Sequence, residues 1–305
     1  MHDCALSGSV PIRAGAVVVF YQPDSGCIDR ANRLSSMVHC VIVDNTEDSD
    51  PARRPGLADE IEYIANGKNL GIATALNLGV QRLKASGFSS VLLFDQDSEP
   101  SEKLCAALPQ VMHDMLGRGE RVAVTGPAYY DERLGGVTPF VRFAAWKLER
   151  IPASGNAVID ADFLISSGSC VNLACWDEIG PMDDALFIDF VDLEWCVRAR
   201  KRGYRVVGVP WIHLKHSLGG EPISVFGRPY PSHNPLRHYY LFRNVIALLL
   251  RGYVPWTWKS TEVVKLPGRL LIYGLFMKPR RTHLVMSLRG MWDGLRGRLG
   301  PYRHG

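Results

Sequence analysis

Several features that would assign a chain to a class at once are missing from this sequence. Its seven cysteines include no CxxC pair and no spacing with histidine that suits zinc, so a zinc module is excluded. Their number is odd, which favours a reduced compartment over a disulfide framework. The N-terminus has no basic start followed by an apolar stretch, and the longest apolar run near the C-terminus, Val245 to Leu250, is far below the roughly 20 residues that span a bilayer. We therefore expect a cytoplasmic protein without a transmembrane helix.

Acidic residues are scarce toward the C-terminus. From position 265 onward Asp293 is the only one, against nine basic residues: Lys265, Arg269, Lys278, Arg280, Arg281, Arg289, Arg296, Arg298 and Arg303. Aromatic side chains precede and interrupt this set, at Tyr239, Tyr240, Phe242, Tyr253, Trp256, Trp258, Tyr273 and Phe276. Such a segment is typical of peripheral contact with an anionic membrane. A helical cap on the main domain and a homo-oligomer interface explain the same pattern. No nucleic-acid recognition fold accompanies it, so we expect no nucleic-acid partner.

The first hundred residues alternate short apolar runs with helical segments. This alternation predicts an α/β fold with a mostly parallel, Rossmann-like sheet flanked by helices. The expected strands cover 16–20, 39–43, 61–64 and 91–94, and the expected helices cover 28–37 and 72–85. Ligands of such sheets bind beyond the carboxyl ends of the strands, which is where Asp44 and the pair Asp95 and Asp97 fall.

Asp95 and Asp97 end the strand expected over 91–94 and are one residue apart. In extended backbone they point the same way, so two like charges share one side with no cation in the local sequence. A polar turn is one explanation. A phosphatase with an Asp nucleophile is another, although Glu99 stands where such enzymes usually have Thr or Val. A glycosyltransferase that holds Mg²⁺ or Mn²⁺, and through it the diphosphate of a nucleotide sugar, is the third.

The second half is predicted to be mixed. A strand over 121–126 precedes a turn-rich stretch, a short strand over 206–209 is closed by Pro210, and helices follow beyond 216. Between the strands, residues 187–203 form a loop that enters a helix, with Gly203 at its C-cap.

Asp189, Asp192 and Glu194 lie within six residues, among large apolar side chains. Carboxyl groups in apolar surroundings have raised proton affinity, which suits a general base. One or two of these acids also fit a helix cap or an ion pair with Arg198 or Arg200.

Six motifs, taken in order, resemble the inverting family 2 glycosyltransferases of GT-A fold over roughly residues 15 to 250. The FDQDS and FIDFVDLEW pieces resemble, more narrowly, bacterial rhamnosyltransferases of O-antigen and related polysaccharide biosynthesis. The motifs are FYQP at 20–23, VDN at 43–45, NLG at 69–71 with Ala75 and Asn77, FDQDS at 94–98, SGS at 167–169, and FIDFVDLEW at 187–195 with Arg198.

The resemblance implies roles for individual residues. Tyr21 and Asp44 would hold the nucleoside, and Asn69, Gly71 and Ala75 would border its base and ribose. Asp97 is expected as a metal ligand, and Asp95 as a contact to the ribose, the metal or its bound water. A later histidine often completes such a site, and the HSLG context favours His216 over His213.

The catalytic base implied by the resemblance is Asp192, counted back from Arg198. The usual pattern has two adjacent acids, whereas this chain has Val191 before Asp192, so Asp189 stays a rival. The acceptor side is expected at Ser167, Gly168 and Ser169, with Glu194 and Trp195 also assigned to it.

The expected organisation is an N-terminal tail over 1–14, a GT-A catalytic domain over 15–220 and a helical, aromatic and basic extension over 221–305. Within the domain, 15–100 would bind the nucleotide and 101–220 the acceptor. The implied donor is dTDP-L-rhamnose, with a UDP-hexose as the alternative, and the implied acceptor is a glycan or a polyprenyl-diphosphate-linked glycan. A non-catalytic nucleotide- or carbohydrate-binding module is the remaining alternative.

Overall fold

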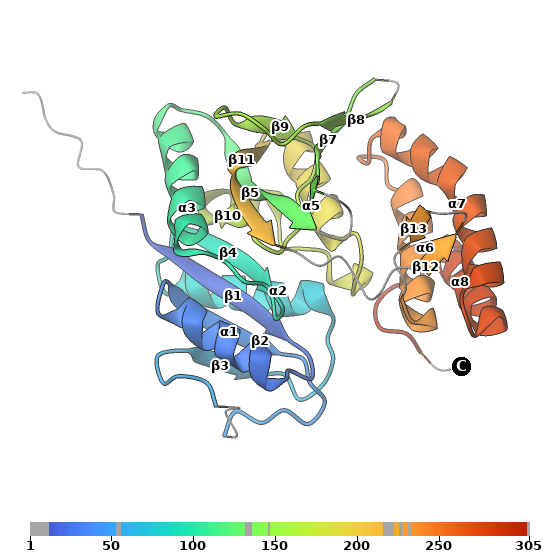
Figure 1. Cartoon of the computed structure of the whole chain (residues 1–305), viewed down its shortest axis with the longest axis horizontal. Coiled ribbons are helices and arrows are strands. Elements are labelled where there is room, and N and C mark those ends of the chain that lie inside the picture. Colours follow the sequence, from blue (N-terminus) through green and yellow to red (C-terminus); the bar gives the residue numbers. More distant parts are fainter. Residues whose placement is uncertain are drawn as a thin grey trace, which may run out of the picture.

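The computed structural model describes residues 12–52, 56–131, 136–145, 147–215, 223–225, 228–230 and 233–303. Its centre is a nine-stranded sheet in the order β3-β2-β1-β4-β10-β5-β11-β9, with β6 paired to β5, and helices lie on both faces (Figure 1). Strands β3, β2, β1 and β4 are parallel to one another, as are β5 and β11, while β10 runs antiparallel between β4 and β5. The predicted α/β class with a mostly parallel sheet is therefore confirmed.

The strands of this sheet are β1 (Ala14–Phe20), β2 (His39–Asp44), β3 (Glu62–Ala65), β4 (Ser90–Asp95), β5 (Val122–Asp131), β6 (Gly136–Val137), β9 (Ile159–Ala161), β10 (Cys170–Asn172) and β11 (Arg205–Lys215). Two hairpins lie outside it: β7 (Phe140–Phe143) with β8 (Leu148–Ile151), and β12 (Ile223–Val225) with β13 (Arg228–Tyr230).

Side chains of the central strands alternate between two apolar cores. In β1, Val17 and Val19 belong to one core and Val18 and Phe20 to the other, and all four are buried. Alternation with both faces buried is expected of a strand covered by helices on each side. Helices α2 (Ile72–Ala85) and α5 (Val191–Lys201) contribute to the first core, and α1 (Ser25–Ser35) and α3 (Glu102–Gly117) to the second. Short helical segments, η2 (Leu173–Cys175), α4 (Trp176–Ile179) and η3 (Asp184–Leu186), connect β10 to α5.

Two predicted boundaries are wrong. The last strand does not end at Pro210, because β11 continues to Lys215 with a shift in its pairing to β5 between Val209 and His213. Such an irregularity accommodates proline, which has no N–H to donate to the ladder. Helix α1 starts at Ser25, before the predicted position 28, because the Asp24 carboxylate accepts a hydrogen bond from the Cys27 N–H and caps it.

Three helices follow the sheet: α6 (Pro235–Leu249), α7 (Trp256–Phe276) and α8 (Arg280–Leu295). Figure 1 shows them grouped at one end of the molecule, on the side of α5 and away from β1 to β3. Leu248 of α6 and Trp258 of α7 pack against Leu193 and Val197 of α5, so the group forms a cap on the sheet domain. None of the helices within the described ranges combines the length and the apolarity that crossing a bilayer demands.

Helices α6 and α8 pack closely because glycine stands at their contact. A Cβ atom at Gly290 would lie 2.3 Å from the carbonyl oxygen of Tyr239, and one at Gly294 would lie 2.6 Å from that of Arg243. Only glycine lets the two backbones approach so closely. The position of α6 therefore depends on α8.

Candidate active site

The four predicted acids of the two motifs meet in one pocket of about 510 Å³ beyond the carboxyl end of β4. Asp95 and Asp97 follow β4 on one side of it. Asp189 and Asp192 lie on the other side, at the start of α5. Arg237, from the first turn of α6, also lines the pocket. Four carboxyl groups therefore share this space with one arginine.

Asp95 is strongly perturbed by these surroundings. Burial raises the pKa of Asp95 to about 7, the carboxylates of Asp97 and Asp192 add to the rise, and Arg237 opposes it. The Asp95 N–H donates to the Ser167 hydroxyl at 3.3 Å, which fixes the backbone where β4 ends. Asp97 is exposed at the pocket, so it is the more accessible of the two acids. A positive charge placed in the pocket would favour the ionised form of Asp95.

Asp192 occupies the first turn of α5. Its Oδ1 atom accepts the Leu193 N–H at 2.8 Å and its Oδ2 atom accepts the Ser166 N–H at 3.3 Å. Burial raises the pKa of Asp192, and the charge of Asp189 contributes in the same direction. Among the described residues no lysine or arginine forms an ion pair with it. A carboxylate that is oriented by main-chain donors and not neutralised by a cation is suited to accept a proton.

Asp189 differs in being paired. Arg237 donates to its Oδ1 atom from Nη2 at 3.1 Å and from Nε at 3.2 Å. The Oδ2 atom is buried and has no hydrogen-bond partner in the described part of the chain. Within the described ranges Asp189 is thus held in an ion pair, whereas Asp192 is oriented by main-chain donors alone.

The loop before α5 has an unusual backbone. Phe187, Asp189 and Phe190 each have φ of 64°, in the left-handed region that residues other than glycine seldom adopt. Such conformations cost free energy and persist only where surrounding contacts hold them.

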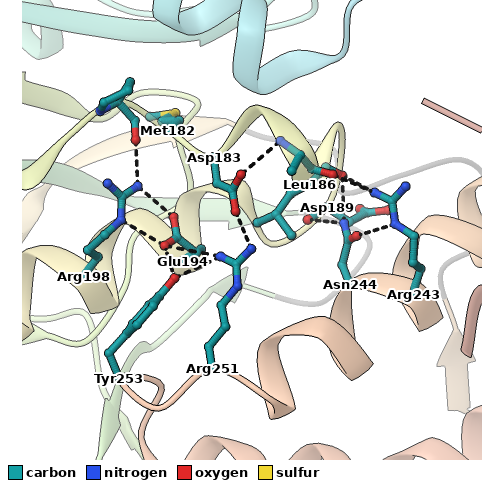
Figure 2. Close-up of polar contacts among 12 residues, drawn as sticks. Met182, Asp183, Leu186, Asp189, Glu194, Arg198, Arg243, Asn244, Arg251 and Tyr253 are labelled. Atoms are coloured by element: carbon teal, nitrogen blue, oxygen red, sulfur yellow. Dashed lines mark hydrogen bonds and ion pairs between the residues drawn. The ribbon is translucent and has the colours of Figure 1, made fainter. Parts of the chain in front are cut away.

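Helix α6 provides part of that support (Figure 2). The Asn244 side-chain amide donates to the carbonyls of Leu186, Ile188 and Asp189, at 2.9, 2.7 and 3.0 Å. Arg243 beside it donates to the carbonyl of Leu186 at 2.8 Å, and both side chains are fully buried. These contacts hold the carbonyls of the loop that carries Asp189 and leads into Asp192.

Helix α2 supports the same segment from the opposite side. The buried Asn77 side chain donates to the Met182 carbonyl at 2.8 Å and accepts the Met182 N–H at 2.9 Å. The Ile72 N–H donates to the Phe187 carbonyl at 2.8 Å. Gly71 has φ of 85°, and a Cβ atom there would lie 2.6 Å from that same carbonyl oxygen, so no other residue fits without displacing the loop.

Three residues expected to bind the nucleoside lie outside the pocket lining, near the carboxyl ends of β1 and β2 and before α2. The Tyr21 N–H donates to the side chain of Gln96, a residue of the pocket. Asp44 is buried, with its carboxylate accepting from the Tyr63 hydroxyl at 2.7 Å. Asn69 accepts the N–H of Gly71 at 3.0 Å.

Several predicted contacts need correction. Ala75 is fully buried in the core beneath α2 and cannot border a base. Ser167 and Ser169 are buried, and the segment pairs with β4 through Gly168 N–H to the Leu93 carbonyl at 2.6 Å. These residues support the carboxyl end of β4 beside the pocket, and their side chains are not available to an acceptor.

Glu194 and Trp195 are also buried away from the pocket. Glu194 accepts from Arg198 at 2.9 Å and from the Tyr253 hydroxyl at 2.5 Å, and lies 3.5 Å from Arg251 (Figure 2). The Trp195 indole donates to the Gly180 carbonyl at 3.0 Å. Their assignment to acceptor binding is replaced by a structural one, because neither side chain reaches open space.

The histidine predictions are not settled by the structure. His216 lies outside the described residues. His213 is exposed on β11 and does not line the pocket. Within the described ranges, no group of three or more His, Cys, Asp or Glu side chains is placed to hold a metal ion.

The residues that the sequence does not reveal come from α6. Arg237 is 48 positions from Asp189, and Asn244 is 55 positions from the same residue. The signal available was local: Asn234 caps a helix whose first residue is Pro235. That pattern predicts a helix but does not predict that the helix packs against the loop of Asp189.

Two relatives among curated proteins are named as sugar transferases. The chain is 28% identical over 293 residues to the dTDP-rhamnosyl transferase RfbF of Shigella flexneri, covering 95% of this chain and 97% of that one. It is 20% identical over 308 residues to the low-salt glycan biosynthesis hexosyltransferase Agl10 of Haloferax volcanii, covering 98% and 96%. A scan against protein families finds no match.

Solved structures share the fold. GalNAc-T7, determined with UDP, GalNAc and Mn²⁺, has a TM-score of 0.56 at 14% identity over 93% of this chain, which spans only 56% of that structure. TarS residues 1–349 of S. aureus, in complex with UDP-GlcNAc, has a TM-score of 0.52 at 12% identity, covering 92% and 81%. Together the fold and the curated relatives identify this chain as a glycosyltransferase of GT-A fold that resembles bacterial rhamnosyltransferases.

Proposed function

We propose that the protein transfers L-rhamnose from dTDP-β-L-rhamnose to a hydroxyl group of a glycan, with inversion at the anomeric carbon. The observation that carries the proposal is the position of Asp192, an unpaired and oriented carboxylate in the same pocket as Asp95 and Asp97. The choice of rhamnose is supported by the near full-length similarity to a protein named as a dTDP-rhamnosyl transferase.

The reaction is a direct displacement. Asp192 accepts the proton of the acceptor hydroxyl as its oxygen forms a bond to the anomeric carbon. The bond from that carbon to the phosphate oxygen breaks, and the nucleoside diphosphate leaves with the bonding electron pair. Because the attack comes from the opposite side, a β-linked donor gives an α-linked product.

The carboxylates of Asp95 and Asp97 fit a divalent cation. Asp95 and Asp97 both line the pocket, and carboxylate oxygens are the ligands that Mg²⁺ or Mn²⁺ binds. With only two carboxylates, the remaining ligands would be donor diphosphate oxygens and water. When bound, the cation stabilises negative charge on the departing diphosphate. Mn²⁺ in the GalNAc-T7 structure supports this assignment.

Arg237 adds a fixed positive charge to the same pocket. Its guanidinium donates two hydrogen bonds to Asp189 and thereby fixes the orientation of that carboxylate. We assign Asp189 a positioning role and Asp192 the proton transfer. On the nucleoside side, Tyr21, Asp44 and Asn69 remain the proposed contacts, since the Tyr21 N–H donates to Gln96 of the pocket and the buried Asp44 ends β2 beside the end of β1. Gly71 is buried against Phe187, so we assign it to the support of the loop.

The acceptor that we propose is a glycan on a polyprenyl diphosphate in cell-surface polysaccharide synthesis, such as O-antigen. A UDP-hexose donor is the second candidate, because both solved neighbours were determined with UDP or a UDP-sugar. The base of a uridine donor presents the same edge to Asp44 as that of thymidine.

A donor panel tests the proposal. Binding and slow hydrolysis of dTDP-L-rhamnose, UDP-glucose, UDP-galactose and GDP-mannose would be measured on chelator-treated protein, with and without added Mg²⁺ or Mn²⁺. We expect metal-dependent binding and hydrolysis with a preference for dTDP-L-rhamnose. Preference for a UDP-hexose would replace the donor, full activity without metal would remove the metal assignment, and binding without nucleoside diphosphate release from any donor would favour a non-catalytic module.

A further inference from the structure

Large exposed apolar side chains are concentrated on two helices. In the described part of the chain, most such side chains belong to α7 and α8: Trp256, Val263, Val264, Leu271, Leu275, Phe276, Leu284, Val285, Leu288, Trp292 and Leu295. Trp256 and Val264 are each 78% exposed, and Trp292 is 52% exposed. Exposed apolar side chains that gather on two neighbouring helices indicate an interaction surface, whereas single exposed apolar residues do not.

The exposed side chains follow helical spacing. On α7, Val264, Leu271 and Leu275 recur at intervals of seven and four, and on α8 Val285, Leu288 and Trp292 recur at three and four. Each helix therefore has an apolar stripe toward solvent in addition to the stripe that packs inward. The stripes approach where the helices pack, since Leu284 lies 3.5 Å from the position of a Cβ atom on Gly274.

The charges on these helices have one sign at the surface. Glu262 and Asp293 are the only acids of α7 and α8, and both are buried. Glu262 pairs with Lys265 at 3.1 Å and with Arg269. Asp293 accepts from the Tyr239 hydroxyl at 2.9 Å and lies 3.6 Å from Arg298.

Basic side chains at the same surface are left without acids. Lys278, Arg280, Arg281 and Arg296 are exposed, and none of them forms an ion pair with any described residue. Arg296 instead lies over the Trp292 ring, 4.2 Å from its centroid. The surface thus presents apolar stripes with a cationic edge.

We propose that the outward surface of α7 and α8, which we call the α7–α8 face, binds an anionic lipid bilayer. Apolar side chains at helical spacing, tryptophans and arginines together match an interface of acyl chains beneath negatively charged headgroups. A second copy of the chain fits less well, because two such faces would bring like charges together. The proposal is independent of the donor and of the catalytic residues.

Docking on a bilayer would also have a consequence for the pocket. Helix α8 crosses α6 at Gly290 and Gly294, and α6 carries Arg237 and Asn244. A membrane bound to the α7–α8 face would therefore contact α8, and α8 packs directly on α6, the helix that holds Asp189 and its loop.

Vesicle flotation tests the proposal on the full chain. Vesicles of phosphatidylcholine alone are compared with vesicles that also contain phosphatidylglycerol. We expect binding only to the anionic vesicles, and at least about a tenfold weaker binding for Arg280→Glu with Arg281→Glu. Leu271→Glu with Trp292→Glu should abolish it. Met37→Glu with Leu116→Glu is the matched control, because these side chains are 36% and 37% exposed elsewhere and the added charge is the same.

Two outcomes overturn the proposal. Equal flotation of the α7–α8 variants and the control pair would show that this face is not the contact. A concentration-dependent dimer of the wild-type chain that Leu271→Glu with Trp292→Glu dissolves, without any vesicle binding, would assign the face to a second copy. Slow hydrolysis of the nucleotide sugar should be unchanged in all of these variants, which separates a failure of this proposal from a failure of the proposed function.

Discussion

The two sides of the pocket are built in different ways. Asp95 stands at the end of β4, and its place follows from the sheet, where Val19 of β1 is its neighbour in register. Asp189 lies in a loop with three left-handed residues, and Asp192 follows that loop. Asn244 of α6 binds carbonyls of the loop, and Asn77 of α2 binds the preceding segment at Met182. The first side is a product of the local fold, and the second depends on packing between distant parts of the chain.

This difference shows that α6, the first of the C-terminal helices, helps to hold the candidate site. A strand end keeps its geometry as long as the sheet exists. The loop that carries Asp189 has an unfavourable backbone conformation, which surrounding contacts must hold. Arg243 and Asn244 donate hydrogen bonds to its carbonyls, and Asn77 exchanges two hydrogen bonds with Met182 before it. We therefore expect substitutions on the two sides to differ in kind.

The largest expected effect comes from the carboxylate that takes the proton. Asp192→Asn should lower kcat by about 10³-fold, within the range for loss of a general base, while donor binding stays close to that of the wild type. Asp189→Asn should lower kcat by only about tenfold, because Asp189 positions Arg237 and the loop and accepts no proton. The measurement is nucleoside diphosphate release at saturating donor and acceptor.

The reverse order of these two losses would exchange the roles of the acids. Arg237→Gln separates the roles further, since it should weaken donor binding and reproduce most of the Asp189→Asn effect. If Arg237→Gln left both donor binding and kcat unchanged, the ion pair would have no part in the reaction.

The strand-end side was predictable from the sequence, whereas the loop side was predictable only in part. An apolar strand followed by Asp95 and Asp97 is a short pattern whose meaning is fixed by strand geometry. The motif around Asp189 and Asp192 was found by its acids in apolar surroundings. However, the sequence could not tell which of its members face the pocket, because that depends on the left-handed turn at Phe187 to Phe190.

Two mistaken assignments have the same physical origin. Glu194 follows Asp192 by two positions, which on a helix turns its side chain to another face. Trp195 follows by three positions, but its indole packs against Trp176 and donates to the Gly180 carbonyl. Glu194 consequently meets Arg198 and Arg251 and joins α5 to the chain after α6. Ala75 similarly faces the sheet because α2 packs with that side inward. Contacts between distant elements decide such cases, and no local pattern encodes them.

An intermediate effect is expected from the support of the loop. Asn244→Ala removes donors to the carbonyls of Leu186, Ile188 and Asp189, and should lower kcat by roughly 10- to 100-fold with little change in donor binding, because the acids move while the strand end does not. The free energy of unfolding should fall by about 1–3 kcal/mol, the usual cost of unpaired buried polar groups.

Asn77→Ala is the matched control for Asn244→Ala. It removes a buried asparagine that supports the same segment at Met182, farther from the acids. We expect a similar loss of stability and a much smaller loss of kcat. Equal losses of kcat, after correction for the folded fraction, would mean that any weakening of the segment acts alike and that α6 has no special positioning role.

The smallest expected effect is a pH dependence of the C-terminal helices. Burial lowers the pKa of His238 to about 3, and the charges of His283, His233 and Arg237 act in the same direction. His238 Nδ1 lies 2.9 Å from Nδ1 of His283, and its ring stacks on Tyr273 of α7 at 3.9 Å between centroids. The folded state thus keeps this imidazole neutral at pH values where the unfolded chain protonates it.

The sign follows from proton binding. Between the unfolded pKa near 6.5 and the folded value, only the unfolded state carries the proton, so stability is present above about pH 6.5 and is lost as the pH falls. Chemical denaturation at about pH 7.5 and about pH 5 should show a decrease of roughly 1–2 kcal/mol. Asp95, whose pKa is raised, acts with the opposite sign, so the wild-type curve alone is not decisive.

His238→Phe retains the stacking on Tyr273 and removes the titrating group, and its curve of stability against pH should be flatter on the acidic side than that of the wild type. Parallel curves for the two proteins would assign the acid sensitivity to another group whose pKa is lowered by burial, such as His233 or His283.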